Sequence, residues 1–497
     1  MSFRLRTART DLRARQSAFR LRTAVAAMIL LAAAGPASAD PWLDDFEAFK
    51  AGLADNYANF EHLILARRTD LPSLAKSREA ALRAAKTDQE RRAVFDAIVR
   101  DDLRDPHVRI DWSPQKDSSS VPCPKEWSDQ EVQSGLRWER IDGFKPLPGP
   151  NPFRAGTVPI GSGRRLGVIR IGQFSERAFP SICGPAAERL QLRPDEPCGS
   201  SCELKLEKEA GRAAAVALAE TLHRLEAGGA ERIAFDLIDT SGGSDWVEAA
   251  MRVAGGELVA PDVGMLKHPA WRSQLETLKT SLQTRVPTAS PAERRELQAR
   301  IVQVDDGLRR LSSACDLRAA WTVAPRTAAG RALPCTRLVS GVMVSTGLKP
   351  LKARKNTSEL ADVSLRYAPY PVGVTRMPLV VIVHDNTHSA AELFAAALRD
   401  NGRAIVVGAT TSGAGCGQFT QQGAGFRLPN SGALVHVPDC TRQRADRSDE
   451  RGGVEPDVAV PWGPSDSGYQ WTAKVVRVIA DLDRQSTKVR NPRQVSR

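Results

Sequence analysis

Long apolar runs are missing from most of this 497-residue sequence. A membrane-spanning helix needs about 20 consecutive apolar residues. Nothing after residue 39 provides such a run, so we expect no integral membrane segment there. Internal repeats and long low-complexity stretches are missing too. Aromatic residues make up only 5%, but 42% hydrophobic and 26% charged residues are ordinary for a globular protein. The length predicts two or three folding units.

Net charge is missing from the body of the chain, although the formal net charge is +12. Residues 1–39 carry seven arginines against one aspartate, and residues 484–497 carry five basic residues and no acid. These two ends hold nearly all of the excess charge, which argues against a basic groove and against a nucleic-acid partner. We interpret the basic tail as a solvated end, while contact with anionic lipid or polymer stays open.

The first 39 residues have the pattern of a secretory signal peptide. Arginines precede the apolar stretch "AVAAMILLAAAG", and "ASA" before Asp40 supplies the small residues that a signal peptidase requires. The apolar stretch is too short for a comfortable transmembrane helix. We therefore expect an exported protein, periplasmic or secreted, that begins at Asp40.

The eight cysteines fit an oxidising compartment, where an even number indicates up to four disulfides. Proximity in the sequence favours the pairs Cys315–Cys335 and Cys416–Cys440. The stretch "CGSSC" at 198–202 has no histidine pair nearby, so it is a poor zinc or thioredoxin motif. A free, reactive Cys416 is the alternative to its disulfide. Nothing in the sequence calls for a cofactor or a metal.

Apolar spacing predicts the order of the elements. Residues 40–112 read as a helical N-terminal domain, with helices at 40–60, 71–87 and 88–103, the last capped by Asp88. Residues 113–163 read as a linker of loops or short strands. In 164–465, apolar strands alternate with helices, which predicts an α/β core with a largely parallel sheet. Insertions lie at about 175–215 and 257–345, the second a helical hairpin, and 466–497 form a C-terminal helix and basic tail.

Three turns between strand and helix could carry chemistry. "DTSGGSDW" at 239–246 has paired glycines whose N–H groups could hold an anion, or which form only a tight turn. "HDNTHSAAE" at 384–392 places Ser389 where a helix begins, as an N-cap or as a nucleophile. There Glu392 could complete a capping box, and His384 and His388 could bind a metal only if they shared one helix face. "DERGGVEPDVAVP" at 449–461 is the third.

The order of these segments resembles the tail-specific, or C-terminal processing, peptidase family. The resemblance covers residues 40–112 and about half of 165–465, and rests on "LRDPHVRI", "LGVIRIGQF", "IAFDLIDTSGG", "THSAAELFAAALRDNGRAIVVG" and "GGVEPDV". It implies a helical N-terminal part and a crotonase-like α/β core of the ClpP/crotonase type. It also implies a catalytic serine in the S-A-x-E turn, which is Ser389.

The sequence departs from that family at the general base. Most members pair the serine with a lysine in a G-K-G stretch, but here "TTSGAGCGQF" has Ala414 at that place. No lysine occurs between Ser389 and Lys474, so the neutral amine of a Ser–Lys dyad is missing. The segment 113–163 is also shorter than the PDZ module of the family.

A second branch, similar to the tricorn protease core, uses serine, histidine and glutamate instead. By that resemblance His107 in "DPHV" is the histidine and Glu450 in "ERGGVEPD" is the glutamate. The oxyanion donors are then the N–H groups of Gly242 or Gly243 and of Ala390. A further serine of that branch has no counterpart, because Pro106 stands beside His107.

The sequence thus predicts a serine peptidase acting on proteins or peptides. Ser389 attacks the carbonyl, His107 accepts its proton, and Gly243 and Ala390 stabilise the oxyanion. Glu450 orients the histidine or holds the substrate's N-terminus. His388 is the competing base, although its side chain diverges from that of its neighbour Ser389. A non-catalytic relative that binds a peptide or apolar ligand, and a hydrolase of cell-wall or small esters, are the alternatives. The oligomeric state is not predicted.

Overall fold

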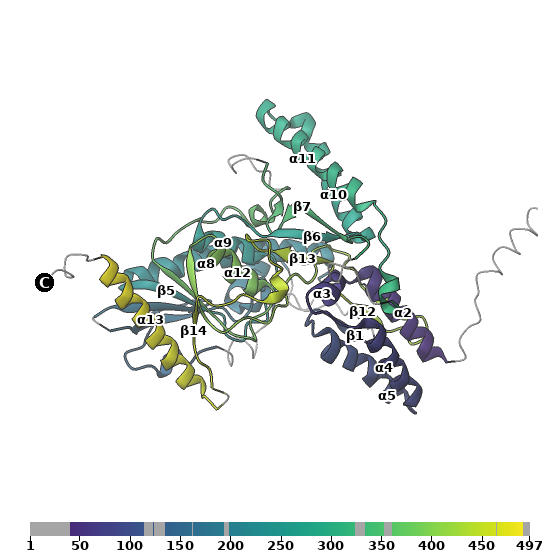
Figure 1. The fold of residues 1–497 in the computed structure, drawn as a ribbon. Coiled ribbons are helices and arrows are strands. Elements are labelled where there is room, and N and C mark those ends of the chain that lie inside the picture. The colour runs from purple at the N-terminus through teal and green to yellow at the C-terminus, as the bar shows by residue number, and fades with distance from the viewer. Residues whose placement is uncertain are drawn as a thin grey trace, which may run out of the picture.

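The computed structural model describes residues 40–113, 123, 135–161, 163–192, 198–323, 333–351, 360–463 and 465–490. The expected signal peptide at 1–39 and the end of the basic tail lie outside these residues. Figure 1 shows an α/β body, a group of N-terminal helices beside it, and a helical hairpin that projects from it.

The apolar runs of the core form a seven-stranded sheet with the order β14-β10-β9-β5-β4-β3-β2. Neighbours from β14 to β4 run parallel, and those from β4 to β2 run antiparallel. The strands are β2 (Lys145–Pro146), β3 (Arg154–Pro159), β4 (Arg165–Arg170), β5 (Ala230–Asp236), β9 (Leu379–Val383), β10 (Ala404–Gly408) and β14 (Val458–Ala459). The predicted α/β class with a largely parallel sheet is confirmed, and 113–163 contributes β2 and β3 to this sheet.

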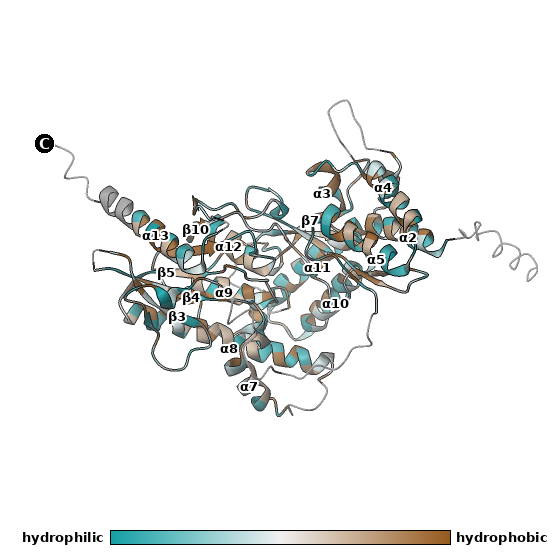
Figure 2. Cartoon of the chain, turned by 90° about the horizontal axis from the view of Figure 1, so that it is seen from below, coloured by the Kyte–Doolittle hydropathy of each residue, from teal (hydrophilic) through white to brown (hydrophobic). Residues whose placement is uncertain are grey.

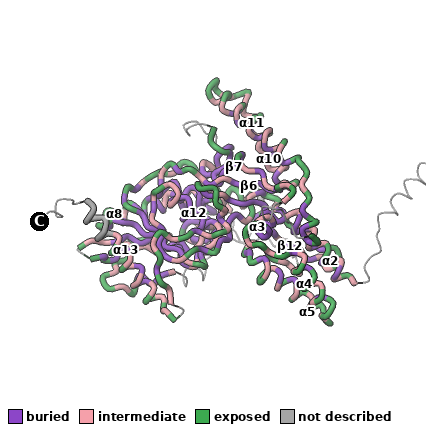
Figure 3. Tube along the Cα trace, viewed as in Figure 1, coloured by how far each residue is buried: buried purple, intermediate pink, exposed green. Residues whose placement is uncertain are grey.

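Helices cover both faces of the sheet because alternate residues of its strands point to opposite sides. Val381 of β9 belongs to one apolar cluster, with residues of α7 (Pro180–Arg189), α8 (Ser200–Ala227), α9 (Trp246–Gly255) and α12 (Ala390–Asp400). Val380 belongs to the opposite cluster, with α13 (Gly468–Arg490). Figure 3 shows α12 buried in the middle of the body. The helix that follows Ser389 thus packs against one face of the sheet and against α9.

A second, antiparallel sheet has the order β13-β6-β7-β8 and carries the helical hairpin. Its strands are β6 (Asp262–Leu266), β7 (Leu338–Val344), β8 (Gly347–Leu348) and β13 (Cys440–Gln443), and the hairpin consists of α10 (Pro269–Arg285) and α11 (Pro291–Leu311). Figure 2 shows more hydrophilic colour along α10 and α11 than along α9 and α12. The predicted hairpin is therefore present, with most of its surface toward solvent.

The N-terminal helices pack against segments from the far end of the chain. They are α2 (Pro41–Asn56), α3 (Phe60–Leu65), α4 (Leu71–Ala84), α5 (Asp88–Ala97) and the π-helical turn η1 (Ile98–Leu103). A small sheet, β1 (Arg109–Asp111), β12 (Leu434–His436) and β11 (Phe426–Arg427), ties the two ends together. The prediction of Asp88 as a cap was wrong, because Thr87 forms the capping box with Glu90. Residues 104–107, which precede β1, therefore lie close to the segments that pair with β1.

The remaining short elements are 3-10 turns: η2 (Trp138–Arg140), η3 (Glu176–Ala178), η4 (Val286–Thr288), η5 (Arg318–Trp321), η6 (Val363–Tyr367) and η7 (Glu450–Gly452). All eight cysteines are paired, as Cys123–Cys183, Cys198–Cys202, Cys315–Cys335 and Cys416–Cys440. Both pairs favoured from the sequence are confirmed. Along the described part of the chain, every helix is too short or too polar to cross a membrane.

Candidate active site

Ser389 lies on a strained turn between β9 and α12. Its backbone has φ 55° and ψ −115°, whereas an ordinary N-cap residue is extended. A non-glycine residue in such a conformation costs about 1–3 kcal/mol, and such strain concentrates at functional sites. Thr387 anchors the turn, since its hydroxyl donates to Leu237 O and accepts from His384 N. The predicted capping partner is also in place, because Glu392 Oε2 accepts the N–H of Ser389 at 2.8 Å.

The glycine turn after β5 packs directly against Ser389. A Cβ on Gly242 would lie 2.8 Å from Ser389 Cβ and 2.9 Å from Ala390 N. A Cβ on Gly243 would lie 1.9 Å from Phe174 O. Among the described residues, we find no acceptor for the N–H groups of Gly242, Gly243 and Ala390. Backbone donors beside a serine at a helix N-terminus suit a developing oxyanion.

His107 is placed by the loop that follows the N-terminal helices. Asp105 Oδ1 accepts its backbone N–H at 3.0 Å and lies 3.7 Å from its Nδ1. Within the described ranges, Nδ1 has no hydrogen-bond partner. The other edge of the ring rests on Gly417, where a Cβ would lie 2.8 Å from Nε2. A side chain at residue 417 would therefore collide with the imidazole.

Burial lowers the pKa of His107, and this is the largest effect. Asp105 and Glu392 raise the pKa, while Arg442 and Arg451 lower it. Glu392 contacts the backbone N–H of Ser389, and Arg442 contacts its carbonyl, so His107 is within electrostatic reach of groups that touch the serine. A lowered pKa keeps the imidazole neutral near pH 7, as a general base requires.

Glu450 contacts an arginine rather than the histidine. Its Oε2 accepts from Arg442 Nε at 2.5 Å, and its Oε1 has no partner in the described part of the chain. Burial raises the pKa of Glu450 to about 7, against the lowering effect of Arg442. The carboxylate next to His107 is Asp105, which sequence reasoning did not single out. Its position two residues before His107, where it accepts the histidine N–H, was the available signal.

The loop at 411–417 stands where the family lysine was expected. Glu392 Oε1 accepts from Thr411 Oγ1 at 2.6 Å and from Gly413 N at 2.7 Å, and Glu392 Oε2 accepts from Gly415 N at 3.2 Å. The disulfide Cys416–Cys440 ties the loop to β13. The methyl side chain of Ala414 offers no base, so the loop serves as support for the site.

The two histidines near Ser389 have separate surroundings. The ring of His384 packs against Trp462 and Trp471, and its Nδ1 lies 2.6 Å from Asp385. His388 Nδ1 lies 2.9 Å from Asn386 O. In the described ranges, no three His, Cys, Asp or Glu side chains come together as a metal site.

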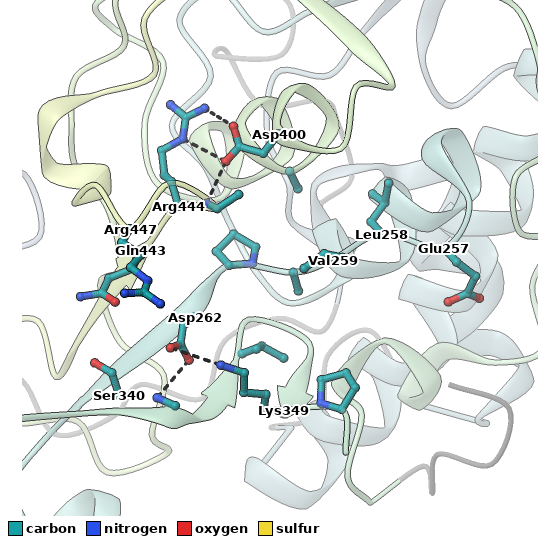
Figure 4. A pocket seen from close by; sticks show the side chains of 17 residues that line it. Glu257, Leu258, Val259, Asp262, Ser340, Lys349, Asp400, Gln443, Arg444 and Arg447 are labelled. Atoms are coloured by element: carbon teal, nitrogen blue, oxygen red, sulfur yellow. Dashed lines mark hydrogen bonds and ion pairs between the residues drawn. The ribbon is translucent and has the colours of Figure 1, made fainter. Parts of the chain in front are cut away.

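Figure 4 shows a cavity of about 1060 Å³. Its lining includes the C-terminal end of α12, whereas Ser389 precedes the N-terminal end of that helix. Its wall includes Ala397 and Asp400 of α12 and Gln443 of β13. Arg444 and Asp400 are joined across one side, and Lys349 and Asp262 across another. The proposed nucleophile is not part of this wall, so we assign the cavity no part in the chemistry at Ser389.

Comparison with known proteins points to one family. Residues 323–460, which include Ser389, Ala414 and Glu450, match the model of peptidase family S41. The chain is 36% identical over 91 residues to a carboxyl-terminal-processing protease of Picosynechococcus sp., covering 18% of this chain and 21% of that protein. It is 39% identical over 104 residues to carboxyl-terminal-processing peptidase 3, chloroplastic, of Arabidopsis thaliana, covering 21% and 18%. An uncharacterized protein of Chlamydia muridarum is 31% identical over 125 residues, covering 23% and 19%.

These matches span about a fifth of the length of the curated relatives. The structural likeness is longer: mature CPAF superposes with a TM-score of 0.53 at 14% identity, covering 92% of this chain and 99% of that chain. CPAF complexed with lactacystin gives 0.54 at 14% identity, covering 90% and 98%. At this identity the likeness shows a shared fold. Residues 323–460, which carry Ser389 and its helix, are thus similar to peptidase family S41.

Proposed function

We propose that this protein is an exported serine peptidase of the tail-specific type, with proteins or peptides as substrates. The observation that carries the proposal is the strained backbone of Ser389 against Gly242, beside N–H groups that have no acceptor among the described residues. A cap alone does not require that conformation, whereas a nucleophile presented to a substrate does. The family match supplies the reaction class. The same proposal places the α/β core in the crotonase-like class.

In the proposed mechanism, Ser389 Oγ attacks the scissile carbonyl carbon while His107 accepts the hydroxyl proton. The N–H groups of Gly243 and Ala390 stabilise the oxyanion, and one such donor is typically worth about 3 kcal/mol. His107 then gives the proton to the leaving amine. Water next attacks the acyl-enzyme while His107 accepts its proton, and the histidine returns that proton to Ser389 Oγ as the acid product leaves. Asp105, which lies beside His107, orients the imidazole in this mechanism, and Glu450 acts through Arg442.

Export is supported by the paired cysteines, because disulfides persist in oxidising compartments. The signal segment itself lies outside the described residues. Cleavage after Ala39 would leave Asp40 as the first residue. Aspartate then caps α2, since its side chain accepts from Trp42 N.

The test is covalent labelling of the mature protein by a fluorophosphonate. We expect labelling of the wild type and none of Ser389→Ala, while His388→Ala retains at least a third of the wild-type rate. His107→Ala should slow labelling by about 100-fold or more, because a general base typically contributes that much. N-terminal sequencing of the same exported material should begin at Asp40.

A correctly folded wild type that is not labelled would overturn the peptidase and favour the non-catalytic relative. If the wild type is labelled but His388→Ala and His107→Ala slow the labelling rate equally, the assignment of His107 as the base would be contradicted. Labelled protein whose N-terminus is Met1 would contradict export. Circular dichroism of each variant separates lost chemistry from lost folding.

A further inference from the structure

Arg442 of β13 joins three parts of the candidate site. Its Nε donates to Glu450 Oε2 at 2.5 Å, and its Nη2 donates to Ser389 O at 3.1 Å and to Gly415 O at 2.8 Å. The side chain is only 8% exposed, and the carboxylate it binds is 1% exposed. A planar guanidinium with several fixed donors can make such a set of contacts, whereas an ammonium cannot reach all three acceptors at once.

Both backbone contacts of Arg442 fall on segments that the chemistry depends on. The Ser389 carbonyl belongs to the strained turn, whose conformation persists only when its surroundings hold it. The Gly415 carbonyl belongs to the 411–417 loop, on which His107 rests through Gly417. One side chain thus fixes the nucleophile's turn relative to the support of the base.

Four charged groups act on His107 from the elements around it. Asp105 belongs to the same loop, Glu392 to α12, Arg442 to β13 and Arg451 follows Glu450 in η7. Arg451 is itself held by Asp105, 3.6 Å away, and by Ala414 O at 3.0 Å. A guanidinium has donors and no acceptor, so these arginines do not replace the missing lysine as a base. They supply fixed positive charge beside the histidine.

We infer that Arg442 is a positioning residue for catalysis, which holds the Ser389 turn against the 411–417 loop and supplies a fixed positive charge within electrostatic reach of His107. The inference rests on the proposed function, since it assigns a role within the same site. In a Ser–Lys relative the basic side chain of this region takes the proton. In this chain the cation is Arg442 of β13, which positions the other groups of the site, and the proposed proton acceptor is His107.

The test follows the pH dependence of the rate of fluorophosphonate labelling. In Arg442→Gln the fixed charge is removed, so the pKa of His107 rises and the acid limb of the profile should move up by about one pH unit. The plateau rate at high pH should also fall, by about tenfold or more, because the turn and loop lose their link. Arg442→Lys keeps the charge, so its acid limb should stay at the wild-type position while its plateau rate falls.

Arg444→Gln is the matched control. Arg444 lies two residues further on, is also 8% exposed, and binds the Asp400 carboxylate at 2.5 Å. Its loss should lower the melting temperature about as much as Arg442→Gln, without moving the acid limb. An unshifted acid limb in Arg442→Gln, or an equal shift in Arg442→Lys and Arg442→Gln, would overturn the inference. Either result leaves the peptidase intact, since the wild type is still labelled and Ser389→Ala is not.

Discussion

Gly242 shows how closely two turns approach each other at the residue scale. Its φ is +90°, and a side chain there would press on both Ser389 Cβ and Ala390 N. The requirement for glycine at this position is therefore steric as well as conformational. Since Ala390 N is one of the proposed oxyanion donors, a side chain at residue 242 would displace a group that stabilises the proposed transition state.

Gly242→Ala should abolish fluorophosphonate labelling or slow it at least tenfold. Gly432→Ala is its control, because Gly432 also has positive φ, 69°, but a Cβ there meets nothing within 4 Å. An alanine at positive φ costs about 1 kcal/mol of the free energy of unfolding, so Gly432→Ala should lose that stability and keep its labelling rate. Equal labelling by both folded variants would show that the glycine turn does not form part of the site.

At the scale of elements, the disulfide Cys416–Cys440 joins the 411–417 loop to β13, the strand that carries Arg442. Cys416 is adjacent to Gly417, on which the His107 ring rests. The bond thus supports the segment on which the proposed base rests. The cysteines were predicted to pair from sequence proximity alone, but their position next to the histidine depends on the fold.

Replacing Cys416 and Cys440 together by alanine should lower the free energy of unfolding by about 3 kcal/mol and slow labelling several-fold. The pair Cys315–Cys335 is the control, since it closes a segment of similar length, 20 residues against 24. Its double alanine variant should lose comparable stability with the labelling rate unchanged. Denaturant unfolding and labelling of the same samples provide the measurement, and equal slowing in both variants would contradict the supporting role.

Across the elements, what could be predicted from the sequence was local. The continuous apolar runs of β9 and β10, the helix after Ser389 and the paired glycines are visible within a dozen residues. The strands β2 and β3 are short and antiparallel, and their signal in a Pro- and Gly-rich segment is weak. Asp105 had a local signal two residues before His107 that was not used. Arg442 and Arg451 escaped notice because their partners are remote: Arg442 is 53 residues from Ser389. The sequence does not distinguish a buried arginine with such contacts from an exposed one; the folded structure is needed for that.

At the scale of the whole molecule, buried carboxyl groups couple stability to pH. Burial raises the pKa of Glu248 to about 8 and that of Glu176 to about 7. Glu176 accepts from Tyr367 at 2.8 Å, whereas Glu248 Oε2 has no hydrogen-bond partner among the described residues. Between the ordinary pKa near 4.5 and these raised values, the folded protein binds more protons than the unfolded chain. The free energy of unfolding must therefore fall as pH rises through that window.

Glu248→Gln separates this effect from others, because glutamine keeps the shape and stays uncharged. In urea unfolding at pH 5.5 and 8.5, the wild type should lose on the order of 2–4 kcal/mol more than the variant on going to the higher pH. His107 acts in the opposite direction: its lowered pKa means that stability is lost as pH falls through the histidine range. That contribution is present in both proteins and cancels in their difference. Equal pH dependence in the two proteins would mean that Glu248 is hydrated or ionised in the folded state, and that the core beside α9 admits water.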